Sequence, residues 1–180
     1  MKRAVIGVKS KTGRAIAVAL AAPNTFICRE ELTLADPNAT VGPYHEVMEL
    51  PWSESIVAVR PAIATIEKIA ARELRRFIDA IRSRGYEVAC VAVVGPADRK
   101  LERIGNPHIR AHAAEGVLFR AVLEKAAASN RIESRLFTDP AKEINASQKK
   151  WIEQMKAVAG TPWRADEKSA AMAAVIALRS

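Results

Sequence analysis

Two histidines and a glutamate recur at helical spacing in the second half of the chain, and these residue types bind metals or move protons. His108, His112 and Glu115 are separated by four and three residues, so an α-helix places all three on one face. Arg120 falls on the opposite, solvent-facing side. Two imidazoles and a carboxylate could hold a zinc ion, or a similar one, with one coordination position open for water. The same groups could instead form a hydrogen-bonded polar network at one end of the core, which is the commoner role of buried polar groups.

Positive charge is the second chemical feature of the sequence. The 180 residues contain 28 lysines and arginines against 20 acidic residues, which gives a formal net charge of +8. Such an excess favours polyanions through phosphate contacts and counterion release, although an inert basic surface would have the same composition. The candidates for phosphate contact form two groups, one near the amino terminus and one in a later loop: Lys9, Lys11 and Arg14, and Arg99, Lys100 and Arg103.

Aromatic side chains that could stack on bases are few. Trp52 and Trp163 are the tryptophans that we expect to be exposed, whereas Trp151 fits the inner face of a helix. Recognition of a nucleic acid would therefore depend on backbone and shape more than on stacking of single strands.

The amino-terminal hairpin would position the first basic group. Two apolar runs, 4–8 and 15–20, flank a polar segment with one glycine, Gly13, which is typical of a β-hairpin. Both runs are rich in Val, Ile and Ala and show little alternation. We therefore predict strands that are covered on both faces and lie at the centre of a mixed sheet.

The rest of the chain alternates strands and helices. Residues 41–55 are predicted to form an irregular connection, because Pro43 and Pro51 break regular structure. Apolar periodicity and β-branched runs predict the remaining elements, in chain order: strand 25–35, helix 61–84, strand 86–94, helix 107–128, strand 132–138, and helices 147–159 and 164–178. This order predicts an α/β fold with a five-stranded mixed sheet, in which three amino-terminal antiparallel strands precede two parallel strands and helices cover both faces. We expect a single domain over residues 1–180.

Several classes of protein lack support in the sequence. No apolar run approaches the roughly 18 residues needed to cross a bilayer, and Lys9 and Lys11 interrupt the first run before a signal sequence could form. We expect a cytoplasmic protein without membrane contact, in which Cys28 and Cys90 are buried free thiols within strands. The sequence has no glycine-rich phosphate loop and no nucleophile elbow. His45, in the irregular connection, is expected to be solvated.

Four stretches of the sequence match the pattern of one known family of proteins. The string VIGVKSKTG is similar to that family's first strand, in which a hydrophobic-Gly-hydrophobic-Asp string precedes a turn with glycine. The stretch IRAHAAEGVLFRAVLEKAA, followed by IESRLFTDPAKEI, resembles its helix and the strand that ends in a proline-containing loop. RADEKSAAMAAVIAL resembles its closing helix, which begins with one or two catalytic aspartates. Through these stretches the chain resembles the ribonuclease H-like superfamily, and within it the RuvC-type Holliday junction resolvases. The resemblance covers nearly the whole chain and implies the same fold.

The resemblance also implies where catalytic acids would stand. In such nucleases four carboxylates at the carboxyl edge of the sheet hold two Mg²⁺ ions, which activate water and stabilise the leaving oxygen. Here Lys9 replaces the first aspartate, and the fourth strand ends near Val94 without an acid. Asp166 matches the first acid of the closing helix, with Glu167 beside it, but Ser169 replaces the next one. A lysine in this place opposes Mg²⁺ by charge repulsion, and we expect it to pair with Asp166.

These residues support three alternative functions. The leading one is a degenerate nuclease that binds DNA or RNA, or assists its processing, through Lys9 and the other basic residues named above, without catalysis and without a cofactor. The second is a divergent metal-dependent nuclease in which Asp166, Glu167 and Glu115 serve as relocated acids, with Mg²⁺ or Mn²⁺, or with Zn²⁺ at the histidine pair. The third is a structural, homo-oligomeric interaction module without a nucleic-acid role.

Overall fold

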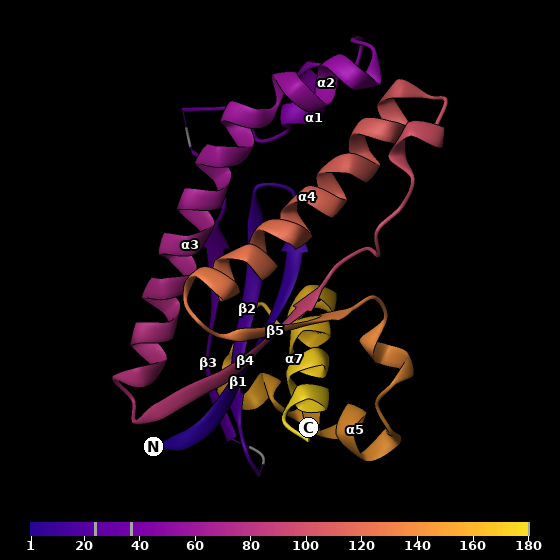
Figure 1. Ribbon diagram of the computed structural model, residues 1–180. Coiled ribbons are helices and arrows are strands. Elements are labelled where there is room, and N and C mark those ends of the chain that lie inside the picture. The colour runs from indigo at the N-terminus through magenta and orange to yellow at the C-terminus, as the bar shows by residue number, and fades with distance from the viewer. Residues whose placement is uncertain (24, 37, 180) are drawn as a thin grey trace.

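A five-stranded mixed sheet forms the centre of the computed structural model, which describes residues 1–23, 25–36 and 38–179 (Figure 1). The strands lie in the order β3-β2-β1-β4-β5. Their bounds are β1 Lys2–Lys11, β2 Arg14–Ala21, β3 Thr25–Thr33, β4 Tyr86–Val94 and β5 Glu133–Phe137. β2 pairs antiparallel with β1 and β3, whereas β4 pairs parallel with β1 and β5. The predicted α/β fold and the central position of the first strand are confirmed.

Helices connect the strands and cover both faces of the sheet. Their bounds are α1 Pro43–Glu46, α2 Trp52–Ala58, α3 Arg60–Arg82, α4 Pro107–Ser129, α5 Ala146–Gln154, α6 Lys156–Ala159 and α7 Ala165–Ala177. α3 and α4 lie on one face, and α7 lies on the other (Figure 1). Within the part of the chain that the structure describes, no helix has the length and apolar character needed to span a membrane.

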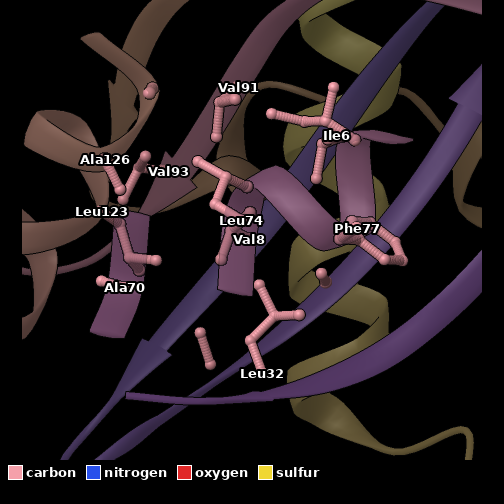
Figure 2. Packing of buried hydrophobic residues seen from close by; sticks show 14 of the residues in the cluster. Ile6, Val8, Leu32, Ala70, Leu74, Phe77, Val91, Val93, Leu123 and Ala126 are labelled. Atoms are coloured by element: carbon pink, nitrogen blue, oxygen red, sulfur yellow. The ribbon is translucent and has the colours of Figure 1, made fainter. Parts of the chain in front are cut away.

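The first core fills the space between the sheet and the α3–α4 layer. Ile6 and Val8 of β1 pack there with Leu74 and Phe77 of α3 and Leu123 of α4 (Figure 2). Each of these side chains is at most 1% exposed, and burial of one such side chain stabilises a fold by about 1.5–3 kcal/mol. The apolar stripe that predicts the long helices therefore corresponds to their buried sides.

The second core lies between the opposite face of the sheet and α7. Val5 and Val18 belong to it, together with the alanine-rich surface of α7. The approach of this helix to β1 leaves no space for a side chain at Gly7, because a Cβ there would lie 1.8 Å from the carbonyl oxygen of Ala170. Small residues on both elements permit this close packing, which fixes the start of α7 beside the end of β1.

The prediction that residues 41–55 are irregular throughout is wrong. Pro43 is the first residue of α1, and Pro51 is the N-cap of α2. Proline is compatible with a helix start because the first backbone N–H groups of a helix have no partner within it. The two prolines therefore begin short helices in this connection.

Three further details differ from the sequence-based expectation. The helix predicted over 147–159 is divided into α5 and α6, and Val158 is 69% exposed instead of lying on an inner face. Trp163 is only 6% exposed, because it packs in the second core, where its indole N–H donates a hydrogen bond to a backbone carbonyl of α5 at 2.9 Å. Trp163 is thus unavailable for base stacking. Cys90 is buried, as predicted, whereas Cys28 is half-buried, and both are free thiols.

Candidate functional site

The carboxyl ends of β1 and β4 meet the start of α7 at one edge of the sheet. Lys9 and Val94 are register partners where the parallel ladder ends. An open hollow of about 500 Å³ lies at this edge, and its lining includes Lys9, Val94, Asp139, Lys168, Ser169 and Met172. In open α/β sheets, ligands bind outside the carboxyl ends of the strands. This edge is therefore the first candidate for a functional site.

The charges around the hollow leave one ammonium group unneutralised. Lys168 pairs with Glu153 at 2.7 Å, and Asp139 pairs with Lys142 at 3.0 Å. Lys9 is half-buried, lines the hollow and has no carboxylate partner among the described residues. A cation in a partly enclosed hollow attracts anions more strongly than one on an open surface.

Asp166 is held by Lys11 and not by Lys9, so the expected Lys9–Asp166 pair is wrong. The Nζ atom of Lys11 donates to Oδ2 of Asp166 at 3.0 Å. Lys9 and Lys11 share one face of β1 because they are two residues apart, and Lys11 is the one that reaches the first turn of α7. The side chains of Lys11 and Asp166 are 38% and 33% exposed, so their ion pair contributes only about 0.2–1 kcal/mol to stability.

Glu167 caps the amino-terminal end of α7. Its Oε2 atom accepts a hydrogen bond from the backbone N–H of Arg164 at 2.9 Å, and the residue is 5% exposed. A glutamate at this helical position accepts a hydrogen bond from the backbone N–H of the N-cap residue, and its negative charge interacts favourably with the helix dipole. Glu167 is not among the residues that line the hollow.

Glu115 lies on the opposite side of the sheet, in α4. It is 2% exposed, and it accepts a hydrogen bond from the backbone N–H of His45 at 3.2 Å and pairs with the Nδ1 atom of His45 at 2.9 Å. The expectation that His45 is merely solvated is wrong, because this contact holds it against α4. Since α4 and α7 cover opposite faces (Figure 1), the structure does not bring Glu115 together with Asp166 or Glu167.

The residues at the β1–β4 edge do not fit a pair of Mg²⁺ ions. Mg²⁺ needs oxygen ligands, usually from carboxylates and water. The positions at which the resemblance implies carboxylates hold Lys9, Val94 and Ser169 instead. Asp166, the remaining acid, already forms an ion pair with Lys11. Two ammonium groups in this place would repel a cation.

The second basic group lies in the loop between β4 and α4. Arg99, Lys100 and Arg103 are exposed and form no ion pair within residues 1–23, 25–36 and 38–179. The loop leaves the carboxyl end of β4, so it borders the same edge as the β1–β2 turn (Figure 1). At that turn, Arg14 pairs with Glu31 at 2.7 Å and is already partly neutralised.

Arg120 links α4 to the loop between β4 and α4 through an ion pair, a role that the helical pattern did not predict. Its side chain is buried, not solvent-facing, and it pairs with Glu124 at 2.7 Å and with Asp98 of the loop. Burial opposes the charge, but hydrogen bonds to the two carboxylates outweigh it and raise the pKa of Arg120. The spacing of four residues between Arg120 and Glu124 is the signal that could have indicated the pair.

Comparisons with known proteins agree with this architecture. No protein-family model matches the sequence, and no curated protein matches it significantly. Among solved structures, the chain is similar to T. thermophilus RuvC in complex with a Holliday junction substrate, with a TM-score of 0.55 and 14% identity over 96% of this chain and 90% of that one. It is also similar to a structure of Thermus thermophilus RuvC, with a TM-score of 0.51 and 11% identity over 96% and 91% of the two chains. At these identities the likeness shows the fold alone, and the expected ribonuclease H-like fold of RuvC type is confirmed.

Proposed function

We propose that this protein binds the phosphate backbone of a nucleic acid at the β1–β4 edge and does not cut it. The observation that carries the proposal is Lys9, which lines the hollow at the position where the resemblance implies a metal-binding aspartate. Among the described residues it has no carboxylate partner. An ammonium group there favours a phosphate oxygen and disfavours Mg²⁺.

The loop after β4 extends this positive edge. Arg99, Lys100 and Arg103 are exposed and well placed to contact further phosphates along a backbone. The similar RuvC structure is in complex with a Holliday junction substrate, so four-way junction DNA is the first ligand to test, followed by duplex DNA and structured RNA. A cytoplasmic location, which we also propose, would give the protein access to all three.

The salt dependence of binding tests the number of phosphate contacts. Each contact changes the slope of log K against log salt by about −0.9 for duplex DNA. If Lys9, Arg99, Lys100 and Arg103 each meet one phosphate, the expected slope is about −3.6. Fluorescence anisotropy with labelled four-way junction over a series of salt concentrations measures it.

A matched pair of variants tests the location of the interface. The test variant replaces Arg99, Lys100 and Arg103 with glutamine, and the slope should become less steep by about 2.7. The control removes the same charge from exposed residues of α3: Arg60, Lys68 and Arg75. The control should bind like the wild type. Equal losses in both variants would mean that binding follows net charge and not the β1–β4 edge.

Cleavage and binding together separate the alternatives. With Mg²⁺ or Mn²⁺ present, we expect bound DNA and RNA to stay intact. Cleavage that is abolished by Asp166→Asn would support a divergent nuclease instead. Absence of binding even at low salt would favour a homo-oligomeric interaction module.

A further inference from the structure

Three histidines gather between α1 and the start of α4, and none of them lines the hollow at the β1–β4 edge. His45 comes from α1, and His108 and His112 come from the first two turns of α4. The Nε2 atoms of His108 and His112 are 3.1 Å apart. The ring centroid of His45 lies 4.2 Å from that of His112 and 5.2 Å from that of His108. One ring nitrogen of each histidine lies within 4.8 Å of the other two.

These separations suit ligands of a single metal ion. Two nitrogens bound to a tetrahedral zinc ion are about 3.3 Å apart, given zinc–nitrogen distances of about 2.0–2.1 Å. The His108–His112 separation of 3.1 Å is close to this value and follows from their spacing of four residues on one helix. Both side chains are exposed, so their rings can rotate to bring their nitrogens closer to the ring nitrogen of His45.

Glu115 orients the third ring. One carboxylate oxygen lies 2.9 Å from Nδ1 of His45, and the other accepts the backbone N–H of the same residue at 3.2 Å. A carboxylate beside Nδ1 keeps the proton on that nitrogen and leaves Nε2 with its electron pair available. Glycine at position 42 lets the start of α1 lie against this carboxylate, because a Cβ at Gly42 would be 2.8 Å from its Oε1 atom. Carboxylate partners of this kind usually accompany metal-bound histidines.

The Nε2 atom of His45 favours a metal site over a closed polar network. This atom is buried and has no hydrogen-bond partner within the described residues. A buried polar atom without a partner is unfavourable, and a complete network would satisfy each of its members. His108 and His112 can satisfy one another through their own hydrogen bond, which leaves His45 out. A cation among the three rings would satisfy it.

We propose that His45, His108 and His112 bind one divalent transition-metal ion, zinc in the first place, and that Glu115 is a positioning residue for His45. Imidazole nitrogens suit Zn²⁺, Co²⁺, Ni²⁺ and Cu²⁺, whereas Mg²⁺ and Ca²⁺ need oxygen ligands. Three histidines leave the fourth position of a tetrahedral ion for water, on the exposed side of His108 and His112. The ion would join α1 to α4. The proposal stands apart from nucleic-acid binding, because the two sites share no residue.

Metal titration of the chelator-treated protein tests the proposal directly. Isothermal titration calorimetry with Zn²⁺ should give one ion per chain. Co²⁺ should give the strong visible absorption that tetrahedral cobalt has and octahedral cobalt lacks. Neither readout requires DNA, RNA or any enzymatic activity. Absence of metal binding would therefore leave the proposed nucleic-acid binding unaffected, and absence of nucleic-acid binding would leave the metal site unaffected.

Single substitutions separate ligands from the positioning residue. His108→Asn and His112→Asn change exposed side chains, and each should weaken Zn²⁺ binding beyond the about 10–100-fold that loss of an outer partner costs. Glu115→Gln should weaken it by about 10–100-fold and keep the stoichiometry of one. Glu46→Gln removes an exposed acid next to His45 and should bind like the wild type. Circular dichroism confirms that each variant is folded. Absence of stoichiometric Zn²⁺ and Co²⁺ binding, or full affinity in both histidine variants, would overturn the proposal.

Discussion

Replacement of Gly7 by alanine adds one methyl group where α7 crosses β1. The new Cβ atom would lie 1.8 Å from the carbonyl oxygen of Ala170, 2.7 Å from its carbonyl carbon and 3.1 Å from the Cβ atom of Ala174. Real Cβ atoms essentially never approach other heavy atoms within 3.0 Å. The helix must therefore move away from the strand by about 1 Å or more.

The cost follows from the kind of atom that is in the way. The obstacle is helix backbone, so rotation of a side chain cannot relieve it. Overpacking a core typically costs about 1–3 kcal/mol, and a backbone clash places Gly7→Ala at about 3 kcal/mol or more. In a chain of this length each kcal/mol lowers Tm by about 2–4 °C, so the expected decrease is about 6–12 °C. Because α7 also lines the hollow, its displacement should weaken nucleic-acid binding.

Urea and thermal denaturation of the wild type, Gly7→Ala and Gly105→Ala measure this effect. Gly105 is the matched control, since a Cβ there would have nothing within 4 Å. Its replacement should change the free energy of unfolding by no more than about 0.5 kcal/mol. A Gly7→Ala protein as stable as Gly105→Ala would refute the close packing of α7 on β1, and with it the position of the hollow.

Three other changes test neighbouring features. Lys11→Met removes a partly exposed ion pair with Asp166, so urea denaturation should show a decrease of at most about 1 kcal/mol in the free energy of unfolding. A larger decrease would mean that solvent screens this ion pair less than its exposure indicates. Arg120→Met removes hydrogen bonds to charged groups and should cost about 2 kcal/mol. It should also speed proteolysis of the loop that Asp98 anchors, and an unchanged cleavage rate would count against this anchoring role. Burial raises the pKa of the Cys90 thiol, so iodoacetamide should modify the unfolded protein much faster than the native protein. Equal modification rates would contradict its burial. Because unfolding lets the thiol ionise at its ordinary pKa of 9.0, the contribution of the buried, protonated thiol to stability is complete below pH 9.0 and should be lost as pH rises further.

The sheet could be predicted because its signals are local. The β-branched runs of β1, β2 and β4 mark strands covered on both faces, and the hairpin and the helical crossover fix which strands pair. The short helices α1 and α2 could not be predicted in this way. Four and seven residues are too few for apolar periodicity to appear, and Pro43 and Pro51 indicated a break where the structure has helix starts.

The candidate sites could be predicted only in part. His108 and His112 share a helix, so their spacing alone brings them together, whereas His45 reaches them through the packing of α1 on α4. No pattern within the sequence reports that packing. The same holds for Lys11, since two lysines on one strand face are equivalent in sequence and only the position of α7 decides which one meets Asp166.

The proposed role of the β1–β4 edge is to bind nucleic-acid phosphates through Lys9 without cutting the nucleic acid. The most direct measurement compares four-way junction binding by the wild type, Lys9→Gln and Lys68→Gln over a series of salt concentrations, with Mg²⁺ added at the end to test for cleavage. We predict that Lys9→Gln binds more weakly with a slope less steep by about 0.9, that Lys68→Gln binds like the wild type, and that the DNA stays intact. A wild-type protein that binds the junction no better than Lys9→Gln does, or one that cleaves it with Mg²⁺, would contradict this role.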